Sequence, residues 1–347
     1  IHEYMELMEL IDAEPFIAVN TGLGTVEEVA EEIQYCNGSM HSDMGKLRAA
    51  NGHPEPYGVK WWAVGNEMYG DWQLGHMPLS EYVKKNNSMA DAIWEVDSTA
   101  KLIAVGHVGE WSQTMLGNSS DYMDLLSEHI YATGSQDRAE HIGLVANQIK
   151  EVADAHRAYR DSIPGLNQKD IRIAMDEWNY WYGDYIYGEL GVRYYHQDAL
   201  GIAKGLHEYF RNSDLYFMAN YAQTVNVIGC IKTTPNAAGF ATTGLPLKLY
   251  RQHFGSLPVK VDAGSTNLDI VAAVTPDKAF LTLAIINEKA ESVEIAFDFK
   301  DSQIGTDGKQ WLIQHNDLLA YNDPDKDPMV KIEETDVVLK NHQLEIQ

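Results

Sequence analysis

The chain has 347 residues, with 51 acidic and 26 basic side chains and a formal net charge of −25. Such an acidic chain repels nucleic-acid backbones and anionic membranes, so no partner of either class is expected, and a neutral substrate is the natural match. The length exceeds that of one ordinary domain and suits a barrel followed by a smaller module. The sequence contains no apolar run long enough to span a bilayer and no signal peptide.

Strands and helices are predicted to alternate over residues 1–256. The predicted strands are 16–20, 61–65, 102–106, 128–131, 171–176 and 215–220, and the predicted helices are 2–12, 26–36, 80–95, 138–160 and 191–211. Thr25 and Glu28 predict a capping box, Ser80 is the expected start of its helix, and 37–59 is expected to be a polar loop. Strands that alternate with helices indicate parallel βα units, as in a (β/α)8 TIM-type barrel.

The pattern changes near residue 257. Short strands are predicted at 268–275, 279–286, 293–299 and 311–314, with turns between them and no long helical pattern. Such a series is typical of an all-β module, here interpreted as a β-sandwich. We therefore expect a (β/α) barrel over 1–256, incomplete at its N-terminus, and a C-terminal β-sandwich over 257–347.

Two of the predicted strands end at an acidic side chain. The run 61–65 is followed by Asn66 and Glu67, and the run 171–176 is followed by Glu177. Parallel strands carry functional groups at their carboxyl ends, because the loops there open into a common mouth. Paired carboxylates in such a mouth suit glycoside hydrolysis, in which one protonates the leaving oxygen and the other attacks the anomeric carbon or activates water. We therefore predict that Glu67 and Glu177 face each other across a sugar.

Several neighbouring side chains suit a sugar site, and several others have a structural interpretation. Asn66, Gln223 and Asn226 suit hydrogen bonds to sugar hydroxyls. Aromatic rings that suit stacking on a sugar are Trp72, Trp111, Trp178, Trp181 and Tyr182. Asp176 is interpreted as a structural acid behind the site, and Trp61 and Trp62 as core residues. His129 is interpreted as a strand-end histidine bonded to its neighbours, with a proton shuttle as the alternative.

Other patterns are weaker. Cys36 and Cys230 are too few for a disulfide framework and are predicted to be buried or half-buried free thiols. The Gly22-x-Gly24 pair lacks the third glycine of a dinucleotide loop, because Glu27 stands there. The series Asp323, Asp325, Asp327 and Glu334 has the spacing of a calcium loop, but Pro328 occupies the glycine position, which favours an acidic turn. No zinc spacing occurs, so no metal or organic cofactor is implied.

Four ordered motifs resemble the α-L-arabinofuranosidases of glycoside hydrolase family 51, over nearly the whole chain. Residues 60–76, around Gly65-Asn66-Glu67, resemble the acid/base segment of that family, and 174–182, around Asp176-Glu177-Trp178, its nucleophile segment. Residues 128–131 resemble the strand whose Tyr lies beside the nucleophile, and 222–228 the motif whose Gln contacts the sugar. Residues 249–255 also resemble the helix that leads into the family's C-terminal β-sandwich.

The resemblance implies a retaining, exo-acting enzyme. Glu67, after the fourth barrel strand, would be the general acid/base, and Glu177, after the seventh, the nucleophile. Asn66, Tyr131, Trp181 and Gln223 would line the arabinose subsite. The implied substrate is a neutral, arabinose-containing plant polysaccharide or oligosaccharide. Retention requires carboxyl groups about 5–5.5 Å apart, close enough for direct attack.

The chain also departs from the family. Strand 16–20 corresponds to the third barrel strand, and the first two strands, with a Pro-Gly-Gly-Asn segment and a Glu that contact the sugar, are absent. A barrel without them exposes two strand edges, so we expect an incomplete sequence or a segment supplied by another chain. The chain begins at Ile1, within an expected element, so its true N-terminus is not seen.

Other functions stay open from the sequence. An endo-glucanase or β-xylosidase on the same scaffold, a sugar-binding protein without activity, and a purely structural protein are the alternatives. The resemblance is compatible with a homo-oligomer and favours a cytoplasmic location.

Overall fold

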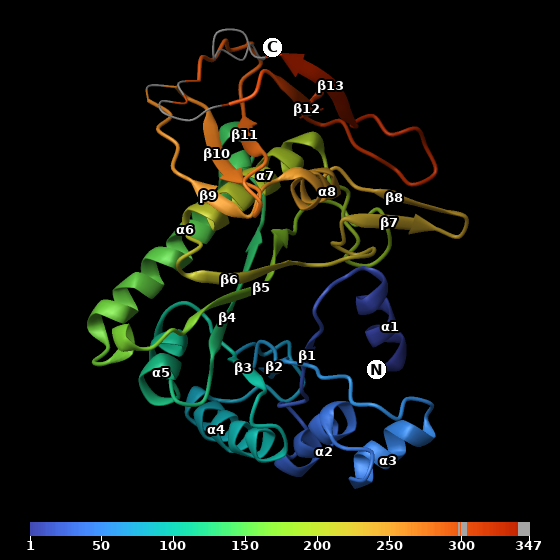
Figure 1. Ribbon diagram of the computed structural model, residues 1–347, viewed down its shortest axis with the longest axis vertical. Coiled ribbons are helices and arrows are strands. Elements are labelled where there is room, and N and C mark those ends of the chain that lie inside the picture. The colour runs from blue at the N-terminus through green and yellow to red at the C-terminus, as the bar shows by residue number, and fades with distance from the viewer. Residues whose placement is uncertain (265, 298, 300–303, 339–347) are drawn as a thin grey trace. The chain divides into compact units, whose positions relative to one another are not determined.

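The computed structural model describes residues 1–264, 266–297, 299 and 304–338 (Figure 1). The chain forms two compact units. The first comprises Ile1–His129, Glu151–Asp176 and Ser213–Asn220, and the second Ile130–Lys150, Glu177–Asn212 and Tyr221–Gln347.

One six-stranded sheet contains the strands that the sequence predicts. Its order is β1-β2-β3-β4-β5-β6, with bounds Phe16–Ala18, Trp61–Val64, Lys101–Ala104, Leu125–Ala132, Arg172–Tyr180 and Tyr216–Tyr221. Strands β1 to β4 pair in parallel, with Phe16 opposite Trp61 and Trp61 opposite Lys101. The order follows the chain because a helix connects each strand to the next, as in βα units. The six predicted strands are therefore confirmed, but β5 continues to Tyr180, so Glu177 lies within this strand and not after its end, as the sequence predicted.

Five helices belong to the first unit alone. They are α1 (His2–Leu10), α2 (Val26–Asn37), α3 (Asp43–Ala50), α4 (Leu79–Val96) and α5 (Glu110–Asn118). The capping box of Thr25 and Glu28 at the start of α2 is confirmed. The expectation that Ser80 opens α4 is wrong, because the helix begins at Leu79 behind Pro78. The expected loop 37–59 is also wrong in part, because Ser42 caps α3 within it.

The apolar faces of α2 and α4 form the core of the first unit. The two helices lie side by side (Figure 1) and pack against β2. Ile33 of α2, Ile93 of α4 and Trp62 of β2 are fully buried, which confirms the core role of Trp62. Burying such side chains contributes about 1.5–3 kcal/mol each.

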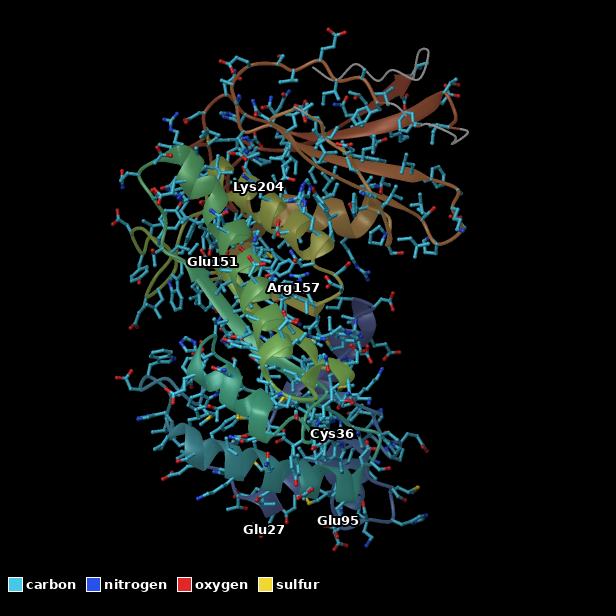
Figure 2. The ribbon with its side chains drawn as sticks, turned by 90° about the vertical axis from the view of Figure 1, so that its left-hand side faces the viewer. Glu27, Cys36, Glu95, Glu151, Arg157 and Lys204 are labelled. Carbon is cyan, nitrogen blue, oxygen red and sulfur yellow. The ribbon has the colours of Figure 1, made fainter. Side chains whose placement is uncertain are left out.

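Cys36 lies in this core, as Figure 2 shows, whereas Glu27 of α2 and Glu95 of α4 lie at the outer surface. Burial, with the nearby charge of Glu32, raises the pKa of the Cys36 thiol to about 12, so it is protonated and unreactive. Cys230 is a half-buried free thiol, and the prediction of two free thiols is confirmed.

The remaining helices lie further along the chain. They are α6 (Arg138–Ser162), α7 (His196–Arg211), α8 (Gly244–His253) and a short 3-10 turn, η1 (Leu166–Gln168). The predicted helix 191–211 starts later, at His196, because Asp198 accepts a hydrogen bond from the backbone of Tyr195 and fixes that residue as the N-cap. Helix α6 runs through both units, as its residue numbers require.

Antiparallel pairs make up the C-terminal region. A three-stranded sheet has the order β11-β10-β9, with β9 (Leu257–Val259), β10 (Asp269–Val274) and β11 (Leu281–Ile286). Strand β12 (Asp307–Ile313) pairs with β13 (Ile332–Val338), and β7 (Ile231–Thr234) with β8 (Ala237–Phe240). The pairs beyond residue 256 confirm the change to an all-β pattern, whereas the β7–β8 pair lies within the segment expected to be barrel and was not predicted.

Two of the predicted C-terminal strands need correction. The predicted strand 293–299 is wrong for its described residues, 293–297 and 299, which have no strand structure. Ile295 is buried against Leu268 and Ile270, so its apolar pattern reflects packing and not pairing. The predicted strand 311–314 is the end of β12, which begins four residues earlier at Asp307. Among the described residues, no helix is both long and apolar enough to cross a bilayer.

Candidate active site

Glu67 projects from the tight turn that ends β2. Gly65 has φ +100°, and a side chain there would approach Thr21 and Met68 to 3.0 Å. Glu67 itself has φ +46°, a left-handed conformation that costs a non-glycine residue about 1–2 kcal/mol. Residues held in such conformations concentrate at functional sites, where the surrounding structure fixes them.

Three side chains of the first unit hydrogen-bond the Glu67 carboxylate. Trp72 Nε1 donates to Oε2 at 2.6 Å, Gln73 Nε2 lies 3.3 Å from the same oxygen, and His129 Nδ1 lies 2.9 Å from Oε1. Burial alone raises the pKa of the Glu67 carboxyl, but these hydrogen bonds and the charge of His129 outweigh burial and lower the pKa to about 2. Glu67 is therefore ionised at neutral pH.

His129 joins Glu67 to a second acid. Its Nε2 atom lies 3.1 Å from Oδ1 of Asp176, and Ser127 Oγ donates to that oxygen at 2.6 Å. The side chains of His129 and Asp176 are only 5% and 8% exposed. Both ring nitrogens therefore lie within ion-pair distance of carboxylate oxygens. The predicted roles of His129, bonded to its neighbours, and of Asp176, a structural acid, agree with these contacts.

The alternation of β4 separates two polar clusters. Side chains at successive strand positions point to opposite faces, so Ser127 and His129 share one face and Glu128 takes the other. Glu128 accepts from Ser112 Oγ at 2.6 Å and lies 2.8 Å from His156 Nε2, fully buried. The sequence motif at 128–131 thus supplies two separate histidine–carboxylate pairs.

In the second unit, Glu177 is paired with Tyr131. The Tyr131 hydroxyl donates to Oε2 of Glu177 at 2.5 Å. The ring of Trp181 meets the Tyr131 ring edge to face at 5.3 Å, and its backbone N–H donates to the carbonyl of Ala132. The structure therefore brings together three of the predicted site residues, Tyr131, Glu177 and Trp181, each half-buried.

Asn179 holds the loop that carries Gln223. Its fully buried amide donates to the carbonyls of Ala222 and Ile228 and to the Tyr194 hydroxyl. Gln223 is exposed at the start of that loop. The predicted site residue Asn66 is half-buried directly before Glu67.

Some aromatic and amide predictions are corrected by the structure. Trp178 is 1% exposed and packs edge to face on Tyr209 and Tyr221, so it is a core residue and does not stack on a ligand. Asn226 bonds the backbone and side chain of Thr233 across its turn and serves the loop. Trp72, in contrast, is 66% exposed while its N–H is bonded to Glu67.

The acidic series near residue 323 does not form a ligand set. Asp323 pairs with Arg193 at 3.1 Å and with Lys326 at 2.9 Å, and it accepts from the Tyr187 hydroxyl. Glu334 lies in β13 and accepts from Trp311. The interpretation of residues 323–327 as an acidic turn fits these contacts.

Three polar residues of these clusters have no distinctive sequence signal. Gln73, Ser127 and Asn179 were not predicted, although Asn179 lies within the nucleophile-like segment. Ser127 lies two positions before His129, and side chains two positions apart on a strand share a face. Strand alternation was therefore the available signal for Ser127. Gln73 reaches Glu67 only because the loop after β2 folds back.

Comparison with known proteins places this arrangement in a family. Family models described as "Alpha-L-arabinofuranosidase 1 domain" and "Alpha-L-arabinofuranosidase C-terminal domain" match residues 1–160 and 176–347. A relative from Aspergillus clavatus, named a probable alpha-L-arabinofuranosidase C, is 32% identical over 72% of this chain and 54% of its own length. A Streptomyces lividans relative, named an intracellular exo-alpha-(1->5)-L-arabinofuranosidase, is 29% identical over 70% of this chain and 40% of its own length.

The solved structures agree. The thermostable GH51 alpha-L-arabinofuranosidase from Thermotoga petrophila superposes with a TM-score of 0.88 and 29% identity, over 98% of this chain and 75% of that one. The fold is that of the (β/α)-barrel glycoside hydrolases with a C-terminal β-sandwich, as the sequence predicted. The chain belongs to the α-L-arabinofuranosidase family, glycoside hydrolase family 51. The endo-glucanase or β-xylosidase alternative is not favoured. The chain spans about half the length of the curated relative from Aspergillus clavatus.

Proposed function

We propose that the protein is a retaining α-L-arabinofuranosidase. It releases terminal non-reducing arabinofuranosyl residues from arabinose-containing plant polysaccharides or oligosaccharides by double displacement. Glu67 is the general acid/base and Glu177 the nucleophile, and Asn66, Tyr131, Trp181 and Gln223 line the arabinose subsite.

One chain of contacts carries this proposal. His129 connects Glu67 to Asp176, and Glu177 is the next residue after Asp176. On β4, Tyr131 follows His129 by two positions, and Tyr131 bonds Glu177. Two positions of β4, His129 and Tyr131, therefore bond the two acids, one acid in each unit, and this supports the assignment of Glu67 and Glu177 as the catalytic pair.

The surroundings of Glu67 and Glu177 fit a reaction in two steps. In the first step Glu177 attacks the anomeric carbon while the leaving oxygen takes a proton from Glu67, and a glycosyl–enzyme ester forms. In the second step Glu67 accepts a proton from water, the water oxygen bonds to the anomeric carbon, and the ester to Glu177 breaks. The Tyr131 hydroxyl donates to Oε2 of Glu177 and orients this carboxylate for attack.

Two variants test the assignment. Glu67→Ala should lower kcat/KM for arabino-oligosaccharide by 10²-fold or more, with a much smaller loss for dinitrophenyl arabinofuranoside, whose leaving group needs no proton. Glu177→Ala should form no covalent adduct with a mechanism-based inhibitor in intact-mass measurements. Asp43→Asn, at a side chain 95% exposed, is the control. Equal losses on both substrates in Glu67→Ala would contradict the acid role.

Further features extend the proposal. The barrel is assigned to residues 1–256 and the β-sandwich to 257–347. The name of the Streptomyces lividans relative supports exo action and a cytoplasmic location. A homo-oligomer is proposed from the family resemblance, and size-exclusion chromatography with light scattering would test it.

A further inference from the structure

The double-displacement mechanism gives no role to His129, whose imidazole lies between two acidic side chains. His129 lies 2.9 Å from Glu67 and 3.1 Å from Asp176 through its two nitrogens, and all three side chains are at most 13% exposed. Opposite charges this close favour the protonated imidazole, and the low exposure limits screening by solvent.

The hydrogen bonds of Glu67 raise a question about its acid role. Both carboxylate oxygens accept from nitrogen donors, and the pKa of the carboxyl is lowered to about 2. A general acid, however, must deliver a proton near the working pH. The indole of Trp72 and the amide of Gln73 do not release protons in water, whereas an imidazolium does.

We propose that His129 stores the proton that Glu67 delivers to the leaving group. Asp176 and Ser127 position the imidazole for this transfer. The inference rests on the proposed function, because it takes Glu67 to be the general acid/base.

The proton balance closes over both steps. As the glycosidic bond breaks, the departing oxygen takes a proton from the Glu67 carboxyl, and Glu67 takes the proton of His129 Nδ1. His129 is then neutral and keeps its Nε2–H on Asp176. In the second step the proton released by the attacking water passes to Glu67 and returns to His129, so no outside acid or base is consumed.

The charges around His129 support this arrangement. Glu67 approaches it from the loop after β2 and Asp176 from β5, and Glu177 follows Asp176 in the chain. Tyr82 of α4 is buried near Asp176, and burial raises the pKa of its phenol, so it stays neutral. On the opposite face of β4, Glu128 is already paired with His156. The ion-pair distances that the structure gives for His129 are therefore both to acidic side chains, Glu67 and Asp176.

His156 offers a matched control within the same strand environment. Its Nε2 lies 2.8 Å from Glu128, and Ser112 donates to that carboxylate, just as Ser127 donates to Asp176. Both histidine–carboxylate pairs are buried, but only His129 contacts Glu67. The variants His129→Gln and His156→Gln therefore remove comparable pairs, and only the first removes the proton store.

The test compares kcat/KM of both variants on arabino-oligosaccharide and on dinitrophenyl arabinofuranoside across pH. We expect His129→Gln to lose about 10²-fold on the oligosaccharide and less than about 5-fold on the activated substrate. The alkaline limb of the pH profile of kcat/KM should move to lower pH in this variant, because the proton for the leaving group is then held by the Glu67 carboxyl alone. His156→Gln should keep the wild-type ratio of kcat/KM values on the two substrates and the wild-type alkaline limb of the pH profile. A His129→Gln variant with equal losses on both substrates, or with an unmoved limb, would overturn the proposal.

A second measurement needs no variant. In the wild-type protein, ¹⁵N chemical shifts of the His129 ring should report two N–H groups across the active pH range, and the proton should be lost at the alkaline limb. A neutral His129 at the pH optimum would overturn the inference even if His129→Gln fails to fold. Failure of the proposed function is distinguishable, because it would appear as unaltered activity in Glu67→Ala or Glu177→Ala.

Discussion

The hydroxyl group of Tyr131 lies 2.5 Å from Oε2 of Glu177. A short bond from a neutral donor to a carboxylate stabilises the charged form and fixes its direction. In a double displacement the same oxygen must lose charge as it bonds to carbon, so the hydroxyl orients the nucleophile and also restrains its reactivity.

Tyr131→Phe should therefore change catalysis with little effect on folding. A hydrogen bond to a charged group contributes about 1.5–3 kcal/mol, which corresponds to about 10- to 100-fold in kcat/KM. Steady-state kinetics with an aryl arabinofuranoside would measure the loss. Tyr185→Phe, at a residue 52% exposed, should retain wild-type kinetics. A Tyr131→Phe variant within 2-fold of wild type would show that the hydroxyl has no role.

Asp269→Asn should destabilise the protein at neutral pH and lose that effect in acid. Asp269 is bonded to His207 and Arg211. Burial raises the pKa of Asp269, but these partners outweigh burial and lower it to about 2. A depressed carboxyl pKa contributes stability above the ordinary value near 3.8, and that stability is lost as the pH falls towards 2.

The expected loss at pH 7 is about 1.5–3 kcal/mol, because hydrogen bonds to charged groups are broken. Thermal unfolding midpoints of Asp269→Asn and wild type should converge between pH 4 and about 2. Asp214→Asn is the control, since Asp214 is 65% exposed in its pair with Arg157 (labelled in Figure 2), and such pairs contribute about 0–1 kcal/mol. A constant difference across pH would contradict the role of the Asp269 charge.

Arg48→Lys should be strongly destabilising despite the conserved charge. The buried guanidinium donates to the carbonyls of Tyr35, His53 and Pro54 at 2.7–3.1 Å. An ammonium on a single stem cannot reach three carbonyls in this fork geometry. Loss of two such bonds predicts about 2–4 kcal/mol, measured by thermal unfolding at pH 7. Lys46→Met on the same helix, at a side chain 63% exposed, should stay within about 0.5 kcal/mol.

Asn179→Ala should loosen the loop that carries Gln223. The variant removes the amide donor from the carbonyls of Ala222 and Ile228, at about 1–3 kcal/mol for the unsatisfied groups. Hydrogen exchange of a peptide covering residues 222–231 should accelerate, while a peptide covering β2 should not change. Unchanged exchange at 222–231 would mean that other contacts, such as the bond from Lys232 to the Val227 carbonyl, hold the loop.

The strand and helix pattern was readable from the sequence because buried parallel strands are short apolar runs and their helices have a clear period. Errors arose where local signals were weak. Helix α3 has mixed composition and depends on its Ser42 cap, and the segment at 293–297 is apolar because it packs, without pairing.

The sequence by itself determined the two acidic residues, Glu67 and Glu177, and the family resemblance, because short motifs are local features of the chain. The strand end that it predicted before Glu177 is wrong, since β5 continues to Tyr180. Only the tertiary structure decided that His129 bridges Glu67 and Asp176, that Tyr131 bonds Glu177 and that Trp178 belongs to the core. Those relationships join residues as many as 62 positions apart. They depend on strand register and on the face of the sheet to which each side chain points, and local composition specifies neither.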